Sequence, residues 1–329
     1  MSATLRNYRL PIILLGIMFI LMLTSSWNDS AIMDELAHAP AGYAYLFLRD
    51  YRLNPEHPPL LKMLAALPLA FVNVNFPTDT KSWIDDVNGQ WDQGRIFLYE
   101  SGNDADHILR LMRLPGMLLA VLLGWLLWAW VHRRFDTRTA NLTLLFYTFS
   151  PTFLAHSRFV TTDLAAAFGF FIGVAAFLRF LKAPAAKNII LTGLALGAAE
   201  LLKFSLLLLL PMYAILLVAW AASRIERPWR ERLRLFGVLA AKTAIIGVVA
   251  LVFISAVYGY AVSNYPPERQ AHDAEFLLSS FGFRPAVDAT VTLIRHDLTR
   301  PFGQYLVGVL MVIQRSSAGN TQYFLGEVT

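Results

Sequence analysis

The chain has 329 residues, of which 56% are hydrophobic and only 16% are charged, and its net charge is +5. Soluble domains carry about 25% charged residues, so this composition excludes an ordinary soluble protein and indicates an all-α polytopic membrane protein. The basic residues lie mainly in short gaps between apolar runs, which indicates membrane orientation and argues against nucleic-acid binding. The sequence contains no cysteine, which excludes disulfides and a cysteine nucleophile.

The first predicted element is the apolar run from Leu10 to Leu23, which we expect to be an uncleaved membrane helix because further apolar runs follow. Residues 28–108 form the first predicted outer loop. Within it, Met33–Leu48 has apolar side chains at helical spacing and predicts an amphipathic helix, kinked or broken at Pro40. The apolar stretch Leu60–Val74 is too short to cross a bilayer, so we expect a re-entrant or interface-lying helix.

Further apolar runs predict the remaining membrane helices. They cover residues 108–131, 142–155, 160–181, 189–202, 206–222 and 236–258, before a second polar loop at 259–301 and a short apolar stretch at 302–313. If the N-terminus is cytoplasmic, the gaps rich in Lys and Arg also become cytoplasmic, and the short gaps on the other side hold only Arg158 and Lys203. This charge pattern predicts a multi-pass protein of the inner (plasma) membrane with its polar loops on the extracytoplasmic face.

Two acidic motifs in the first loop are candidates for chemistry. The adjacent carboxylates Asp34 and Glu35 open the amphipathic helix, where they could act as a base or as metal ligands; an acidic first turn that caps the helix is the simpler explanation. Glu56 and His57 precede two prolines, which stiffen the loop that presents them. Glu and His are also metal ligands, and a rigid turn is the alternative.

Other charged residues fall at the predicted outer ends of membrane helices. Asp163 lies close to Arg158, and Lys203 lies three residues after Glu200, so each has a structural ion pair as its simplest explanation. The functional alternative is that Lys203 contacts a lipid phosphate. A cation from the second loop would also suit a phosphate leaving group; the candidates are Arg269, His272, Arg284, Arg295 and His296. The sequence has no phosphate-binding glycine motif, so it predicts no nucleotide cofactor.

Taken in order, these motifs resemble the membrane-embedded GT-C glycosyltransferases, in particular bacterial relatives of the protein O-mannosyltransferases and of the lipid A aminoarabinose transferases. The matching positions are Met33–Glu35, Gly42, Tyr45, Asp50–Asn54, Glu56–Leu60, Lys62, Arg113–Pro115, Thr162–Leu164 and Lys203–Ser205, with a leucine run that ends at Pro211. The resemblance runs from about residue 8 to at least residue 260. It implies a GT-C-like transmembrane helix bundle with an outer amphipathic-helix loop.

The resemblance also implies an activity, which is transfer of a sugar from a polyprenyl-phosphate-linked donor to a lipid, glycan or protein acceptor on the extracytoplasmic face. It implies that Asp34 is the catalytic carboxylate and that Glu35 supports it. The residues that it implies in substrate binding are Arg52, Glu56, His57, Lys62, Asp163 and Lys203. In the aminoarabinose-transferase branch, a Glu-Lys-Pro-Pro stretch binds a metal through its Glu and lipid phosphate through its Lys; here Glu56 matches and His57 replaces the Lys. A divalent metal ion at Glu56 and His57 is therefore the candidate cofactor.

Relatives of this kind are usually longer, so we expect residues 1–329 to be one glycosyltransferase domain that is truncated at its C-terminal end. Two other functions use the same helices. A flippase or transporter of lipid-linked sugars would place paired charges or broken helices at the middle of the membrane, whereas the charges here cluster at the outer rim. An inactive scaffold of the same fold would not need Asp34, Glu35 and Glu56.

Overall fold

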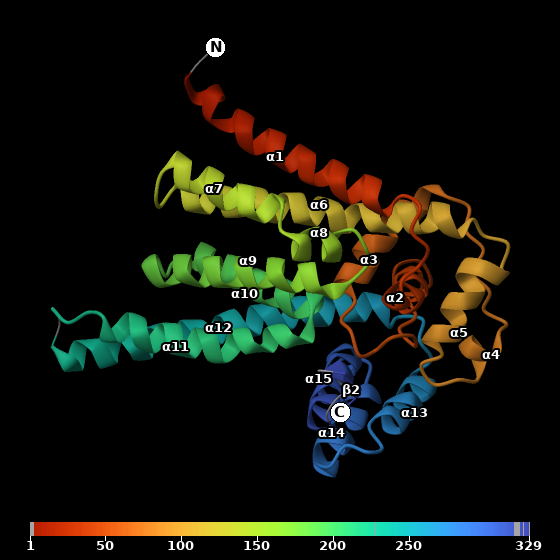
Figure 1. The fold of residues 1–329 in the computed structure, drawn as a ribbon. Coiled ribbons are helices and arrows are strands. Elements are labelled where there is room, and N and C mark those ends of the chain that lie inside the picture. Colours follow the sequence, from red (N-terminus) through yellow and green to blue (C-terminus); the bar gives the residue numbers. More distant parts are fainter. Residues whose placement is uncertain (1–2, 227, 319–322, 325, 329) are drawn as a thin grey trace.

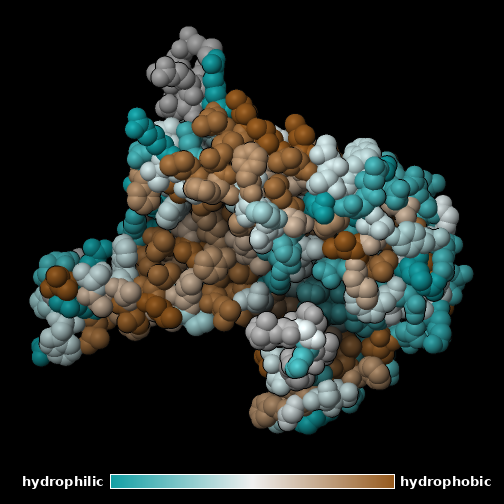
Figure 2. All heavy atoms as spheres, in the orientation of Figure 1, coloured by the Kyte–Doolittle hydropathy of each residue, from teal (hydrophilic) through white to brown (hydrophobic). Residues whose placement is uncertain are grey.

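A computed structural model describes residues 3–226, 228–318, 323–324 and 326–328. Nearly all regular structure within these residues is helical, which confirms the predicted all-α class (Figure 1). The long helices lie side by side, and successive ones run in alternate directions. The polar segments gather at one end of this bundle, where Figure 2 shows a mostly hydrophilic surface, while the bundle itself is covered by hydrophobic side chains.

The bundle is made of α1 (Ala3–Ser26), α6 (Ala105–His132), α7 (Thr137–Thr148), α8 (Pro151–Ser157), α9 (Thr162–Lys182), α10 (Ala186–Leu202), the 3₁₀-helix η4 (Phe204–Leu208), α11 (Leu209–Ala222) and α12 (Trp229–Ala261). Among the described residues, five helical segments are long and apolar enough to cross a membrane. They are Tyr8–Ser26, Ala105–His132, Thr162–Lys182, Phe204–Ala222 and Trp229–Ala261. The chain is therefore a multi-pass membrane protein, as its composition predicts.

The sequence predicted one helix over the apolar run at residues 142–155, and this prediction was wrong, because the structure has two helices there. The helix α7 ends at Thr148, and α8 begins at Pro151. Proline suits the first position of a helix but keeps the preceding residue out of the helical region. Ser150 accordingly has extended backbone angles (φ −67°, ψ 118°). The chain between α6 and α9 is therefore made of two short helices.

The first polar segment follows α1 and covers the end of the bundle. Its elements are α2 (Met33–Tyr43), the π-helix η1 (Ala44–Leu48), α3 (Leu60–Ala66), the 3₁₀-helix η2 (Leu67–Phe71), α4 (Lys81–Ile84), α5 (Gln90–Arg95) and the π-helix η3 (Ile96–Glu100). The expected kink or break at Pro40 is absent, because α2 continues to Tyr43 and widens only afterwards into η1. The packing of α2 between α3 and α5 compensates for the hydrogen bond that proline removes. Together α3 and η2 are too short to span, as expected.

Two glycines allow α2 to be enclosed so closely. A Cβ atom on Gly42 of α2 would lie 2.4 Å from the carbonyl oxygen of Lys62 in α3. On the other side, a Cβ on Gly94 of α5 would lie 1.8 Å from the carbonyl oxygen of Leu36 in α2. No side chain fits at such separations, so both glycines are needed to bring these backbones together.

The second polar segment follows α12 and contains α13 (Pro267–Leu277), α14 (Arg284–Ile294) and α15 (Arg300–Ala318). The short strands β1 (Tyr323–Phe324) and β2 (Glu327–Val328) pair antiparallel after it, with Tyr323 opposite Val328. Arg269 joins the two polar segments, because it bonds Asp273 on α13 (2.7 Å) and the carbonyl oxygen of Asp86 (2.9 Å). Arg269 is therefore committed to a structural role. The predicted apolar stretch at 302–313 lies within α15, which packs on α12 and α14.

Candidate active site

The adjacent carboxylates at the start of α2 have opposite environments. Asp34 is exposed, and none of the described residues forms a hydrogen bond or ion pair with its side chain. Glu35 is completely buried. The helical rotation of about 100° per residue separates the two side chains: one faces the solvent at the polar end of the bundle, and the other faces the core. Of this pair, only Asp34 can meet a substrate directly.

Glu35 is held in a buried ion pair with Arg113 of α6. Its Oε1 accepts from Arg113 Nε at 2.9 Å, and its Oε2 accepts from Nη2 at 2.7 Å. Arg113 also donates to the carbonyl oxygens of Ser26, Asp29 and Ser30, so it joins the end of α1 to the start of α2. This bidentate, fully buried geometry is rigid. Glu35 was predicted to support Asp34 as a catalytic group, but the structure places it where it fixes the position of Asp34.

Two side chains of α2, Glu35 and His38, also form hydrogen bonds with the segment that leads into α9. The backbone N–H of Val160 donates to Glu35 Oε1 at 3.1 Å, and the Val160 carbonyl oxygen pairs with His38 Nδ1 at 2.6 Å. Because that carbonyl can only accept, Nδ1 carries the proton and Nε2 of His38 is left as an acceptor. Burial, together with the positive charge of Lys62, lowers the pKa of His38 to about 4. His38 is therefore neutral at pH 7.

His57 lies next to His38, although it comes from the loop before α3. The two imidazole rings meet edge to face with their centres 5.3 Å apart. Burial lowers the pKa of His57 as well, with further contributions from Lys62, His38 and Lys203. The electrostatic influence of Lys203 on both rings indicates that the end of α10 lies near them. The structure thus brings together residues from α2, the 54–59 loop and the end of α10.

Asp163 and Lys203 complete this group from the ends of α9 and α10. Lys203 Nζ donates to Asp163 Oδ1 at 2.7 Å, and His156 Nδ1 lies 3.4 Å from the other carboxylate oxygen. Asp163 is about half exposed and Lys203 one-quarter exposed, so this ion pair is open to solvent. The expected partner of Asp163 was Arg158, but Arg158 instead lies 3.3 Å from Asp29. Lys203 was likewise expected to pair with Glu200, but it pairs with Asp163 instead.

Lys62 and Arg52, which were also predicted as site residues, form bonds within the protein. Lys62 is fully buried, and its Nζ donates to the carbonyl oxygens of Asn54 (3.0 Å) and His57 (2.9 Å). Burial lowers the pKa of Lys62 well below its usual value, although Glu56 acts in the opposite direction. Arg52 forms an ion pair with Asp50 at 2.7 Å. Lys62 and Arg52 are thus used within the protein, and a substrate contact would require these bonds to break.

A divalent metal ion does not fit the candidate ligands in this arrangement. The Glu56 carboxylate accepts from Asn88 Nδ2 (3.1 Å) and Gln90 Nε2 (2.6 Å), whereas the His57 ring faces His38. Within the described ranges, no three His, Asp or Glu side chains gather in a way that could hold a metal ion. We therefore derive no step of the reaction through a metal.

Three residues near the site were not singled out from the sequence. His38 was detectable in principle, because it lies one helical turn after Asp34. His156 reaches Asp163 from α8, a helix that the sequence did not separate. Arg315 of α15 contributes to the lowered pKa of His57, so it approaches the site from a helix far along the chain. The second-loop cations that the sequence offered for a phosphate leaving group are not among the main causes of the lowered pKa values of His38 and His57.

The comparisons with known proteins agree with this architecture. The family model of dolichyl-phosphate-mannose-protein mannosyltransferases matches residues 106–260. The structure is similar to that of the Saccharomyces cerevisiae protein O-mannosyltransferase Pmt1-Pmt2 complex bound to the sugar donor, with a TM-score of 0.54 and 20% sequence identity. That alignment covers 79% of this chain and 35% of the yeast chain, so this chain spans about one-third of its length. No curated protein matches the sequence.

Fold and comparisons together define a polytopic membrane protein with the GT-C fold of glycosyltransferases. The predicted resemblance to relatives of the protein O-mannosyltransferases is thereby confirmed.

Proposed function

We propose that this chain transfers a glycosyl group from a polyprenyl-phosphate-linked sugar to an acceptor at the polar end of the bundle. The observation that carries the proposal is the position of Asp34, an exposed carboxylate without a partner among the described residues, on a helix whose next residue is locked in the core. Such a carboxylate is available to react and is held rigidly. The match to mannosyltransferases supports a donor that carries mannose or a related sugar.

In this proposal, Asp34 is the general base. Its carboxylate accepts the proton of an acceptor hydroxyl while the hydroxyl oxygen forms a bond to the anomeric carbon of the sugar. The bond between that carbon and the phosphate oxygen breaks, and the polyprenyl phosphate leaves with the electron pair. A single displacement of this kind inverts the anomeric configuration.

We assign the stabilisation of the departing phosphate to Lys203. Its ammonium group is partly exposed, and Asp163 fixes its direction through a hydrogen bond of 2.7 Å. Two further N–H groups of the ammonium remain to donate. The lowered pKa of His57 keeps its ring neutral. Unlike the buried His38 beside it, His57 is partly exposed, so it can accept a hydrogen bond from a sugar hydroxyl without adding charge to the site.

The orientation in the membrane follows from the distribution of basic residues. The ends of α6 and α9 that lie away from the polar segments carry Arg133, Arg134, Arg179 and Lys182. The positive-inside rule assigns this end to the cytoplasm. We therefore propose that Asp34 works on the extracytoplasmic face of the plasma membrane.

The test is transfer by the purified chain in liposomes, with radiolabelled sugar on a polyprenyl phosphate, compared with the same sugar on a nucleotide. We expect labelled acceptor only from the lipid-linked donor. Movement of labelled donor across the bilayer without any labelled acceptor would favour a flippase and refute the proposal. The absence of both would also contradict it, provided that the chain is folded and that envelope lipids, glycans and proteins are all supplied as acceptors.

A further inference from the structure

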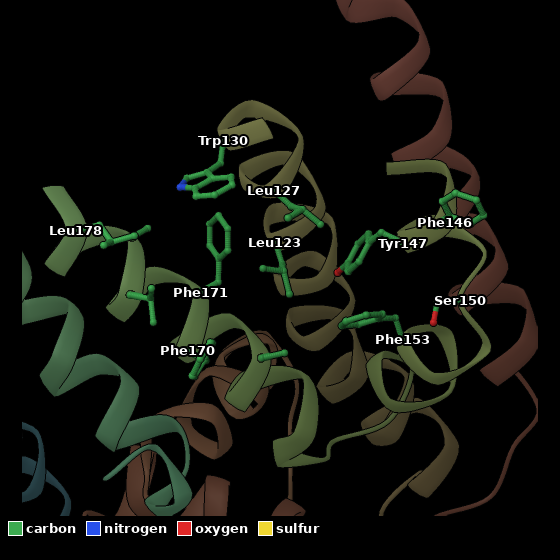
Figure 3. A pocket seen from close by; sticks show the side chains of 13 residues that line it. Leu123, Leu127, Trp130, Phe146, Tyr147, Ser150, Phe153, Phe170, Phe171 and Leu178 are labelled. Atoms are coloured by element: carbon green, nitrogen blue, oxygen red, sulfur yellow. The ribbon is translucent and has the colours of Figure 1, made fainter. Parts of the chain in front are cut away.

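An apolar cavity opens between α6, α7, α8 and α9, and neither Asp34 nor Lys203 lines it. Its volume is about 680 Å³, and side chains such as Leu123, Phe153, Phe171 and Leu178 line it (Figure 3). Figure 2 shows the same side of the bundle as a hollowed, hydrophobic surface. The lining is mostly apolar, and its only polar side-chain groups belong to Trp130, Tyr147 and Ser150, so the cavity suits a hydrocarbon chain better than ordered water.

A second cavity of about 550 Å³ lies at the basic end of the bundle, between α6, α9 and α10. Arg133 and Arg134 at the end of α6 line it, together with Arg179 and Lys182 at the end of α9. Its lining shares residues with that of the apolar cavity, among them Trp130. The two hollows therefore adjoin, and together they form a cleft with a hydrocarbon-lined part and a cationic mouth.

The cations at this mouth have no carboxylate to balance them. Among the described residues, Arg133, Arg134, Arg179 and Lys182 take part in no ion pair. Arg134 stacks on Trp130, with its guanidinium carbon 3.8 Å from the ring centre, and donates to the Trp130 carbonyl oxygen at 3.3 Å. Basic residues here also orient the helices, but orientation does not require them to surround one cavity. Concentrated, uncompensated charge beside an apolar cleft fits an anionic group that carries a hydrocarbon chain.

We propose that this cleft binds an anionic phospholipid of the leaflet at the basic end of the bundle. Its phosphate lies among Arg133, Arg179 and Lys182, and one acyl chain follows the cleft past Trp130 toward Phe171. This ligand is distinct from the sugar donor, because Arg133 and the Glu35 partner Arg113 are twenty residues apart on α6, a separation of about 30 Å. A donor phosphate bound at this mouth could not present its sugar to Asp34.

The test uses native mass spectrometry of the intact chain in detergent, with dioleoyl phosphatidylglycerol or dioleoyl phosphatidylcholine added. The variant Arg133→Gln/Arg179→Gln removes two cations from the mouth. The control Arg138→Gln/Lys187→Gln removes the same charge from exposed positions at the same end of the bundle that do not line either cavity. Each cation contributes about 1 kcal/mol to the binding of anionic lipid, so we expect about 30-fold weaker phosphatidylglycerol binding in the first variant and little change in the control.

A second variant examines the acyl chain separately from the phosphate. Ala175 lines both cavities, so Ala175→Phe narrows their junction, and we expect it to weaken phosphatidylglycerol binding without any change in charge. Glycerol phosphate, which has the headgroup but no chain, should not compete even in 100-fold excess. Equal binding of the two lipids by the wild-type chain would overturn the proposal regardless of how any variant folds. Equal losses in the charge variant and its control would overturn it too, as would effective competition by glycerol phosphate.

Discussion

Replacing Glu35 with Gln should destabilise the protein strongly. In the wild-type protein the side chains of Arg113 and Glu35 are 1% and 0% exposed, and their charged groups are 2.7 Å apart. The variant keeps the volume of the side chain but leaves the Arg113 guanidinium buried without a counter-charge. Breaking a buried ion pair from one side costs about 3–5 kcal/mol, which is a large part of a typical stability of about 5–15 kcal/mol. The new amide would also direct N–H groups at N–H donors.

The neighbouring carboxylate provides the matched control. Asp34 is exposed and has no side-chain partner in the described structure, so Asp34→Asn should change the free energy of unfolding by less than about 0.5 kcal/mol. The assay is reversible unfolding of both variants in mixed micelles, followed by circular dichroism over a denaturant titration. If Glu35→Gln stayed within about 1 kcal/mol of the wild type, the buried ion pair would not hold α2 in place, and the reasoning would be wrong.

Three further predictions concern the support of the site. Lys62→Met leaves the carbonyl oxygens that now accept from Nζ without a donor, so thermal unfolding in detergent should show a loss of at least about 1–3 kcal/mol; an unchanged midpoint would contradict the buried bonding. Gly42→Ala forces a methyl group against a backbone oxygen and should cost about 1–3 kcal/mol in the same assay, whereas a neutral effect would rule out the close approach of α2 and α3. Because the pKa of His38 is lowered from 6.5 to about 4, the unfolded state binds a proton between these pH values that the folded state does not. The free energy of unfolding should therefore fall as pH drops from 7 to 4, by about 3 kcal/mol at most, and His38→Gln should flatten this dependence.

The helix bundle is largely readable from the sequence, because long apolar runs and the positions of Lys and Arg follow directly from the properties of a bilayer. Boundaries inside an apolar run are harder to find. Hydropathy averages across the break before Pro151, so α7 and α8 looked like one helix. The irregular turn after Tyr43 was also displaced from the expected position at Pro40, because tertiary packing of α2 outweighs the local effect of proline.

The site is less predictable, because its bonds join residues that are distant in sequence. Glu35 and Arg113 are 78 positions apart, and nothing in either local motif indicates that they pair. Lys62 looked available to a phosphate, since a lysine in an apolar helix usually extends its charge toward water. It is buried instead because the backbone of the 54–57 loop folds around it. Sequence patterns thus located the loop that holds Asp34 but could not separate reactive side chains from those that position them.

The most direct test of the account is the rate of sugar transfer from a polyprenyl-phosphate donor by Asp34→Asn, per folded molecule in liposomes. Asp92→Asn, which changes an exposed carboxylate of α5 in the same polar segment, is the control. Loss of a general base lowers rates by about 10²- to 10⁴-fold, so we expect such a fall for Asp34→Asn and a wild-type rate for Asp92→Asn. Equal rates for wild-type and Asp34→Asn protein would show that Asp34 is not the catalytic carboxylate.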